Sequence, residues 1–392
     1  MTPRRVALLT GTLGTGGAER QVLTLAAHLD RREFATDVIS LKHHGSLAGE
    51  LAQLNTNHWS AAAGPGFDLA AVRRLAGRLR DARYDVVLAT NQYCGTMLRL
   101  ATLVGPRPPR LIAAFHSSPA HVGDGVRDRA RLLAYRIALR GYDRLIYVGR
   151  RQRDEWLARG FAAGMPSDVI YNGVDVARFT AVPARDVRAE LGWDRSHFVV
   201  GLCAALRREK RVLDLLDAAV TLVARGMPLR LLIIGDGAQR RAIEERVDAL
   251  GLRAITVVTG LQPDVAPFIH ACDVMTLVSA VEAFSIAVLE AMACGKPMVL
   301  TRVGGAAEQI EPGVSGYLVD VGKPQQIADR LAHIWHAGEA QRLGARARER
   351  VLRDFSLARM VEQYASVFRG EPLGDAAALG VAVAAGAKRA NA

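Results

Sequence analysis

Hydrophobic residues along the chain fall into two alternating patterns. Short continuous apolar runs predict buried strands, and between them apolar residues recur every three or four positions, as on one face of a helix. In the first half these patterns predict strands at residues 6–10, 36–41, 85–89, 111–115 and 144–148 and helices at residues 18–29 and 68–82. Strands that alternate with helices are typical of a parallel sheet covered on both faces.

The pattern breaks near Tyr171, at VIYNGVDVARF, where Asn-Gly is a turn signal. It then restarts and predicts strands at residues 198–204, 229–234, 255–259, 274–278 and 297–301, helices at 212–224 and 239–250, and a loop leading into a hairpin at 304–319. The predicted fold class is therefore α/β, with two doubly wound, Rossmann-like domains that face a cleft. Open sheets of this kind bind ligands at the carboxyl ends of their strands.

These breaks divide the chain into four parts. We expect an N-terminal domain, a C-terminal domain, a closing helix and a disordered tail rich in alanine and glycine, at residues 1–176, 177–354, 355–370 and 371–392.

Composition narrows the choice of partners and location. The 392 residues carry a net charge of +12, mostly from arginine, which favours phosphates, anionic lipid or nucleic acid as partners. The four cysteines are scattered and form no CxxC pair, so neither a disulfide framework nor a zinc site is expected. We find no signal peptide and no apolar run near the roughly 20 residues of a membrane span, and therefore expect a cytoplasmic protein.

The first predicted strand runs into a glycine-rich loop, GTLGTGGAER, that precedes a helix. Glycines allow backbone amides to approach an anion, and the N-terminus of the next helix favours one. The spacing differs from the GxGxxG of dinucleotide-binding folds. An anion-binding loop at Gly16 and Gly17 and a plain tight turn both fit this segment.

A basic segment, AALRREKRVLDLL, follows a strand and opens a helix. It contains Arg207, Arg208, Lys210 and Arg211. Cations are unfavourable at the positive end of a helix dipole. We therefore favour an anion such as a diphosphate bound among them over a solvated basic helix start.

The apolar stretch SAVEAFSIAVLEAMACGKPMVL contains two carboxylates, Glu282 and Glu290. A helix that begins near Ser285, a suitable N-cap residue, gives Glu290 apolar neighbours at i±3 and i±4. Because an isolated buried carboxylate is costly, we expect Glu290 to project into a cleft and bind paired hydroxyls, such as a ribose diol. Glu282, in the preceding loop, would meet a second hydroxylated group. The alternative is that both carboxylates are buried against arginines.

Two features of the first domain have two interpretations each. His116 ends a predicted strand, at the edge where ligands bind, although a lone histidine is more often structural. Residues 127–153 interleave arginine with large apolar residues. Such a surface can bind an anionic membrane, or it can be an arginine-rich helix packed on the sheet.

Taken in order, these segments resemble the group 1 (family 4) glycosyltransferases, which are retaining enzymes of the GT-B fold. The matching segments are GGAER at 16–20, NGVD at 172–175, GDG at 235–237, the pair Glu282 and Glu290 around Phe284, AMA-x-G-x-P at 291–297 and VGG-x-x-E-x-I at 303–310. The resemblance implies that the first domain binds the acceptor, that the second binds a nucleotide-sugar, and that the closing helix crosses back to the first.

The resemblance also implies roles for single residues. In donor binding, Glu290 holds the ribose hydroxyls and Lys210 the diphosphate, while Gly16 and Gly17 close on the diphosphate from the first domain. The backbone where the helix begins holds sugar hydroxyls and phosphate; its residues are Phe284, Ser285 and Ile286.

The catalytic candidates that the resemblance implies are Glu282, facing the transferred sugar, and His116, near the sugar and the acceptor. The chain departs from the family at Ala205, where an arginine is usual, and Arg207 is our candidate to supply that charge. No Asp-x-Asp metal motif and no obvious covalent nucleophile are present. We therefore expect metal-independent, front-face, retaining transfer, with the nucleotide diphosphate sugar as co-substrate and no other cofactor.

The acceptor expected from the resemblance is a glycan or a lipid-linked precursor of the cell envelope, with an anionic membrane as a candidate surface. The main alternative is a non-catalytic nucleotide-sugar-binding protein of the same fold. A dinucleotide-dependent dehydrogenase is disfavoured, because GxGxxG is missing and no acidic residue ends the second strand. Nucleic acid is not an expected partner, because no recognised binding module is present.

Overall fold

The computed structural model of the protein describes residues 2–14, 16–42, 45–54, 56–64, 67–123, 125–180 and 185–373. The described chain forms two compact units, of which the second is Gly173–Arg359 and the first contains the described residues before Gly173 together with residues 360–373. The division falls inside the predicted NGVD turn. Most of the predicted tail, residues 374–392, lies outside the described residues.

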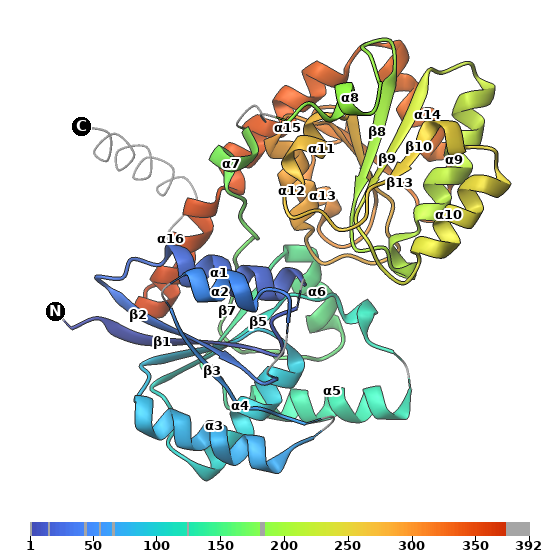
Figure 1. The fold of residues 1–392 in the computed structure, drawn as a ribbon. Coiled ribbons are helices and arrows are strands. Elements are labelled where there is room, and N and C mark those ends of the chain that lie inside the picture. Colours follow the sequence, from blue (N-terminus) through green and yellow to red (C-terminus); the bar gives the residue numbers. More distant parts are fainter. Residues whose placement is uncertain are drawn as a thin grey trace, which may run out of the picture. The chain divides into compact units, whose positions relative to one another are not determined.

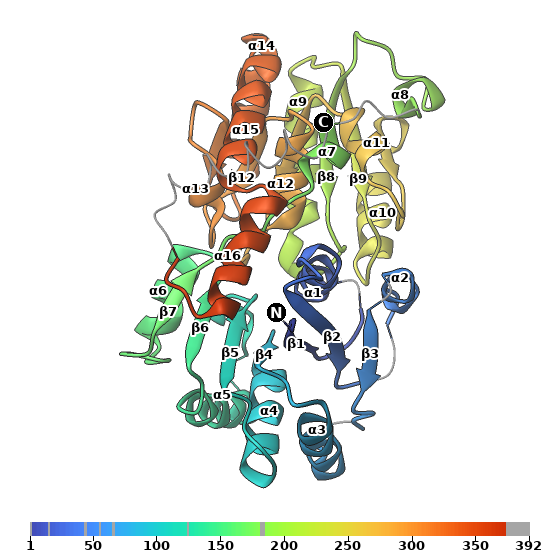
Figure 2. The same ribbon diagram turned by 90° about the vertical axis from the view of Figure 1, so that its left-hand side faces the viewer.

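The first unit is a parallel sheet with helices on both faces. Its described strands have the order β3-β2-β1-β4-β5-β6-β7, which Figure 2 shows following one another across the view. The strands are β1 (Arg4–Thr10), β2 (Phe34–Ser40), β3 (Asn57–Ser60), β4 (Val86–Ala89), β5 (Arg110–Phe115), β6 (Arg144–Tyr147) and β7 (Ser167–Val169). The helices are α1 (Gly17–His28), α2 (Ala48–Gln53), α3 (Leu69–Ala82), α4 (Gln92–Val104), α5 (Val126–Leu139) and α6 (Arg150–Ala158), with a 3₁₀ turn at Pro119–His121. Figure 1 shows α3, α4 and α5 on one face and α1 and α2 on the other.

The second unit has the same architecture, with the strand order β10-β9-β8-β11-β12-β13. The strands are β8 (Phe198–Cys203), β9 (Leu229–Ile234), β10 (Thr256–Val258), β11 (Val274–Leu277), β12 (Met298–Thr301) and β13 (Gly316–Val319). The helices are α7 (Val176–Thr180), α8 (Val187–Glu190), α9 (Val212–Ala224), α10 (Arg240–Ala249), α11 (Ala266–His270), α12 (Ile286–Ala293), α13 (Ala306–Gln309), α14 (Pro324–His336) and α15 (Ala340–Asp354), with 3₁₀ turns at Arg208–Lys210 and Arg253–Ile255. This confirms the predicted fold class of two Rossmann-like domains.

The central strands contain continuous apolar runs, as expected where helices cover both faces of a sheet. Val6, Leu8 and Leu9 of β1 are fully buried, as are Val199 and Val200 of β8. In both sheets the strand order reverses next to the first strand, so β1 lies between β2 and β4, and β8 between β9 and β11. Ligands bind at such reversal points.

Three described strands were not predicted. β3 and β7 are short edge strands in which no residue is fully buried, so their hydrophobic signal is weak. The hairpin predicted within residues 304–319 is wrong, because β13 pairs in parallel with β12. Between β12 and β13, the helix α13 and the turn after it return the chain to the amino edge of the sheet.

The last helix, α16 (Leu357–Arg369), begins in the second unit and ends in the first. At its end, the rings of Phe368 and Phe34 pack edge to face with centroids 6.1 Å apart, and Arg369 pairs with Glu33 at 2.7 Å. Arg110 Nη1 also donates a hydrogen bond to the Val367 carbonyl at 2.9 Å. These contacts fix the end of α16 to the sheet of the first unit.

Candidate active site

The two segments that follow β8 and β11 meet at the reversal point of the second sheet. Lys210, in the 3₁₀ turn after β8, pairs with Glu282, in the loop after β11, with 2.5 Å between Nζ and Oε1. Both side chains are mostly buried, at 18% and 15% exposure. The hydroxyl of Ser279 donates a hydrogen bond to the same carboxylate oxygen at 2.7 Å. The sequence alternative of carboxylates buried against arginines does not describe Glu282, whose partner is a lysine.

Backbone contacts hold these two segments together. The amide of Ala280 donates a hydrogen bond to the Glu209 carbonyl at 2.7 Å. The loop after β12 closes over Glu282 at Gly304, whose φ is +46° and where a Cβ would lie 2.0 Å from the Glu282 carbonyl oxygen. Only glycine fits this close approach, which explains the first glycine of the VGG segment.

Helix α12 begins where the sequence predicts, with Ser285 as its N-cap. The Ser285 hydroxyl makes no capping bond, and its carbonyl accepts a hydrogen bond from Gln309 Nε2 at 2.7 Å. The ring of Phe284 is buried and packs on Phe355 with centroids 5.4 Å apart. The side chain of Phe284 therefore anchors the loop, and the backbone of Phe284, Ser285 and Ile286 remains the candidate for ligand contact.

Glu290 lies in the second turn of α12 and is half-buried. The pKa of the Cys203 thiol, at the end of β8, is raised mainly because the thiol is buried and secondly by the negative charge of Glu290. Glu290 is thus close to the carboxyl end of the central strand of this sheet.

The basic segment after β8 does not act as one cluster. Arg211 adopts φ +50° at the start of α9 and forms two hydrogen bonds with Asp214, at 2.7 and 2.9 Å. Lys210 pairs with Glu282. The exposed Arg207 and Arg208 line a pocket of about 200 Å³ with Arg211 and Gln239. Neither Arg207 nor Arg208 has an ion pair or side-chain hydrogen bond with another described residue, so both can receive an anion.

In the first unit, Gly16 is the N-cap of α1 and Gly17 its first residue. A Cβ on Gly16 would lie 2.2 Å from the Glu19 carboxylate, so a larger residue there would displace the Glu19 side chain. Thr12 Oγ1 donates to Glu19 Oε1 at 3.4 Å and accepts a hydrogen bond from the Gly14 amide at 3.3 Å. A carboxylate of the chain itself therefore lies over this loop, a feature that the glycine pattern did not predict.

His116 follows β5 directly, at the carboxyl edge of the first sheet, and is partly buried. Removal from water lowers the pKa of His116 to about 4. No hydrogen bond joins its ring to another residue of the described chain. The imidazole is therefore neutral near pH 7 and can accept or donate a proton in a hydrogen bond.

Two residues that the sequence analysis missed fix the His116 loop. The fully buried Gln152 donates hydrogen bonds to the carbonyls of Phe115 and Ser117, at 2.8 and 2.9 Å. Trp156 Nε1 donates to the same Ser117 carbonyl at 3.0 Å. Both side chains come from α6, more than 30 residues further along the chain, so no local pattern could identify them.

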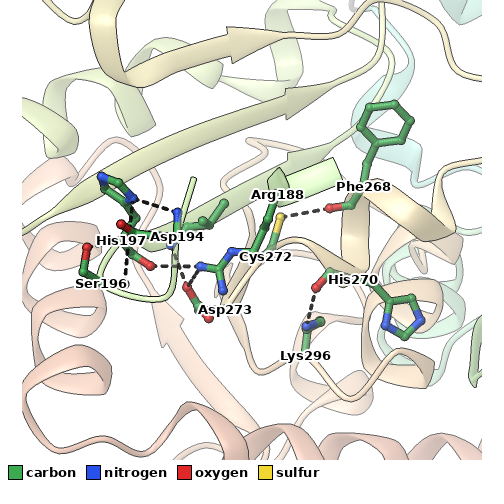
Figure 3. Close-up of polar contacts among 10 residues, drawn as sticks. Arg188, Asp194, Ser196, His197, Phe268, His270, Cys272, Asp273 and Lys296 are labelled. Carbon is green, nitrogen blue, oxygen red and sulfur yellow. Dashed lines mark hydrogen bonds and ion pairs between the residues drawn. The ribbon is translucent and has the colours of Figure 1, made fainter. Parts of the chain in front are cut away.

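A second polar cluster lies at the opposite, amino edge of the second sheet. Arg188 of α8 donates hydrogen bonds to Asp273 Oδ2 at 2.8 Å and to the His197 carbonyl at 2.9 Å, and Figure 3 shows its guanidinium directed at Asp273. Lys296 Nζ donates to the His270 carbonyl at 2.9 Å in the same view. These residues precede β8, β11 and β12 and therefore lie away from the edge where open sheets bind ligands.

No three His, Cys, Asp or Glu side chains of the described chain are grouped so that they could hold a metal ion. None of the described helices combines the length and the apolar character needed to cross a membrane.

Two family models match successive parts of the chain. The model of Glycosyltransferase Family 4 matches residues 15–178, and that of Glycosyl transferases group 1 matches residues 184–350. Together with the two Rossmann-like sheets, these matches define a glycosyltransferase of the GT-B fold. The chain belongs to the group 1, family 4 type of glycosyltransferases, as its sequence indicated.

Curated relatives have different acceptors in their names. N-acetyl-alpha-D-glucosaminyl L-malate synthase of Bacillus anthracis is 33% identical over 200 residues, which are 51% of this chain and 52% of that protein. A D-inositol 3-phosphate glycosyltransferase of Corynebacterium urealyticum is 38% identical over 42% of each chain. The chain thus spans about half the length of these relatives or less. The putative glycosyltransferase EpsD of Bacillus subtilis is 28% identical over 77% of this chain and 80% of its own.

Solved structures share the fold over nearly the whole chain. HepE of Anabaena, in complex with UDP-glucose, has a TM-score of 0.82 at 23% identity and covers 93% of this chain and 99% of its own. Sucrose-phosphate synthase of Thermosynechococcus elongatus has a TM-score of 0.78 at 21% identity, over 94% and 98% of the two chains. At this level of identity the likeness concerns the fold alone.

Proposed function

We propose that this protein transfers a sugar, with retention of configuration, from a nucleotide diphosphate sugar to a lipid-linked or cell-envelope glycan precursor. The observation that carries the donor half is the meeting of Lys210, Glu282 and the start of α12 at the reversal point of the second sheet. An ammonium and the free amides of a helix N-terminus suit a diphosphate. The carboxylate of Glu282 suits sugar hydroxyls, and that of Glu290, further along α12, suits the ribose diol.

The reaction follows from these placements. The bond between the anomeric carbon and the diphosphate oxygen breaks, and the bond to the acceptor oxygen forms on the same face. The proton of the acceptor hydroxyl passes to the departing phosphate. Lys210 and the α12 amides stabilise the charge that develops on the leaving diphosphate, and no other cofactor is required.

Arg207 is the proposed substitute for the family arginine that Ala205 replaces. Its guanidinium lines the pocket after β8 and has no partner in the described chain. An unpaired arginine next to the proposed diphosphate site is available for a charge-assisted contact. Gly16 and Gly17 of the first unit are the proposed second contact with the diphosphate, and His116 is the proposed contact with sugar and acceptor.

A panel of nucleotide-sugars tests the donor half. Thermal unfolding with UDP-, GDP-, ADP- and dTDP-sugars should identify one donor that raises the melting temperature, since binding to the folded state stabilises it. Glu290→Ala should remove most of that shift. No shift with any member of the panel would contradict donor binding, and a shift without release of nucleoside diphosphate to any acceptor would favour the alternative of a non-catalytic binding protein.

Helix α5 is the observation that favours a membrane-bound acceptor. Its buried face is formed by Tyr135, Ala138 and Leu139. On the opposite side, Val126, Leu133 and Ile137 are exposed at 85%, 59% and 57%. This spacing places them in one stripe of the helix, and α5 also carries five arginines, at positions 127, 129, 131, 136 and 140, the last being its C-cap.

An exposed apolar stripe between arginines fits a helix that lies in the plane of an anionic membrane. Each exposed apolar side chain would enter the acyl boundary, and the arginines would meet lipid phosphates. We therefore propose that the protein works peripherally, at the inner face of a membrane. The malate and inositol phosphate in the relatives' names make a small acidic acceptor the competing possibility.

Co-sedimentation with vesicles tests this acceptor proposal. We expect the protein to bind vesicles that contain phosphatidylglycerol and to remain free with phosphatidylcholine alone. Leu133→Ser with Ile137→Ser should abolish binding, whereas Val223→Ser, an exposed apolar position at 44% on α9, should not. Equal binding by all three proteins, or none by the wild type, would contradict a membrane role for α5.

A further inference from the structure

The two oxygens of the Glu282 carboxylate have different surroundings. Oε1 accepts hydrogen bonds from Lys210 Nζ at 2.5 Å and from Ser279 Oγ at 2.7 Å. A carboxylate oxygen has about two acceptor sites, so Oε1 is saturated. No hydrogen bond or ion pair joins Oε2 to another residue of the described chain. One oxygen is therefore held by the protein and the other keeps its capacity to accept.

Ser279 is placed by the sheet itself. It follows β11 and is fully buried, and its carbonyl accepts a hydrogen bond from Thr301 Oγ1 at 2.6 Å. Thr301 ends the neighbouring strand β12 and is 1% exposed. A serine hydroxyl has one proton to donate, and here it is used on Glu282. A chain of buried hydrogen bonds thus runs from β12 through the end of β11 to the carboxylate.

The space on the inner side of Glu282 is too small for a sugar. A cavity of about 10 Å³ lies there, lined by Glu282, Ser285 and Thr301 among others. This volume is about that needed for a single water. A sugar must therefore reach the carboxylate from outside this cavity.

We propose that Ser279 is a positioning residue for sugar transfer. Thr301 holds Ser279, and Ser279 fixes Glu282 so that Oε2 accepts a hydroxyl of the transferred sugar. This inference deepens the proposed function and depends on it. The hydrogen bonds to Oε1 fix the rotation of the carboxylate before the donor arrives, so less side-chain freedom is lost on binding. Lys210 uses one of its three protons on Oε1 and keeps two for the diphosphate.

Ser279→Ala tests the proposal through two ligands that differ only in the sugar. The probes are UDP-glucose and UDP, or the pair that the nucleotide-sugar panel identifies. We expect kcat to fall about tenfold, the loss typical of one hydrogen bond to a charged group. Affinity for the nucleotide-sugar should also fall, while affinity for the nucleoside diphosphate should stay unchanged because it has no sugar to meet Oε2.

Thr301 provides a second variant and Thr276 a matched control. Thr301→Val should lower kcat about threefold, by loosening Ser279, and Thr301→Ser should restore it, since the hydroxyl is kept. Thr276 lies on β11, is 1% exposed and donates its hydroxyl proton to the Gly201 carbonyl at 2.9 Å, away from Glu282. Thr276→Val should therefore leave kcat unchanged.

The outcomes separate this inference from the function on which it depends. Wild-type kcat in Ser279→Ala and Thr301→Val, or an equal loss of affinity for both ligands, would overturn the positioning role. If circular dichroism shows that Ser279→Ala does not fold, the kcat values of Thr301→Val and Thr301→Ser decide the question. A wild-type protein that binds neither ligand, or that never releases nucleoside diphosphate, would instead contradict the proposed function.

Discussion

Two partly buried ion pairs lie at opposite edges of the second sheet. Arg188 and Asp273, at the amino edge, have side chains 23% and 28% exposed, and Lys210 and Glu282, at the carboxyl edge, 18% and 15%. Burial alone therefore does not distinguish the two pairs, but the other hydrogen-bond partners of each pair do.

The pair at the amino edge binds backbone. Asp273 Oδ2 also accepts a hydrogen bond from the Val199 amide at 2.7 Å, and the Asp273 amide donates to the Val199 carbonyl at 2.8 Å. The pair at the carboxyl edge binds only side chains, with Ser279 as the third member. The first pair thus fixes where two strands begin, whereas the second is the pair that we propose to meet the donor. Charged groups that keep unused hydrogen-bonding capacity at the carboxyl edge of an open sheet are candidates for ligand binding.

The largest expected effect is on activity. Lys210→Ala should lower sugar transfer by about 10²- to 10³-fold, as the loss of one preorganised group that stabilises the leaving charge does. The free energy of unfolding in urea should change much less than the activity, because Glu282 keeps the Ser279 hydroxyl as a hydrogen-bond donor. Lys323→Ala, an exposed lysine before α14, serves as the control in the nucleoside diphosphate release assay. Transfer at the wild-type rate by Lys210→Ala would remove the distinction between the two pairs.

The matching effect on stability belongs to the other pair. Asp273→Ala should lower the free energy of unfolding in urea by about 2 kcal/mol, because Arg188 and the Val199 amide both lose a partner. The folded fraction should keep the wild-type kcat. Asp248→Ala breaks an exposed pair with Arg253, 59% and 56% exposed, and should cost less than about 1 kcal/mol. A larger loss of kcat than of stability in Asp273→Ala would contradict its purely structural role.

A third test concerns His116, the neutral group of the first unit. Its pKa is lowered to about 4 by burial, whereas an unperturbed histidine titrates near 6.5. Between these values the unfolded chain binds a proton that the folded chain does not, so stability present above pH 6.5 is lost as pH falls toward 4. His116→Gln should flatten this slope in urea titrations between pH 7 and pH 4.5, and His28→Gln, exposed on α1, should retain it. An unchanged slope in His116→Gln would show that His116 is not held neutral.

The smallest expected effect is on the donor KM and concerns Arg207, a cation that belongs to neither pair. Arg207→Ala should raise the donor KM about fivefold, since a partly solvated charge-assisted contact is lost. Adding Ala205→Arg should restore the affinity by placing the guanidinium at the family's usual position. Steady-state kinetics with the preferred donor measure both. A donor KM unaffected by Arg207→Ala would leave the function of the missing arginine unassigned.

Regular elements were predictable because their signals are local. α9 and β9 were predicted to the residue, and the start of α12 follows from Ser285 as its N-cap. The edge strands β3 and β7 and the parallel strand β13 were missed, because short strands or strands near glycine turns carry little periodic signal. Thr301 and Gln152 were also missed, since their partners lie 22 and 37 residues away along the chain. Ser279 was missed although Glu282 is only three residues away, because no local pattern shows that its hydroxyl is directed at that carboxylate.

The sequence alone determined the two α/β domains, the family, and the residue types that a nucleotide-sugar site requires. Those features depend on hydrophobic period, turn residues and motif order, which are properties of neighbouring positions. Only the tertiary structure decided that the basic segment separates into Lys210 on Glu282, Arg211 on Asp214 and an unpaired Arg207. It also decided which oxygen of Glu282 is held and which is left to accept, because hydrogen bonds depend on distances that only the packing of β8, β11 and β12 sets.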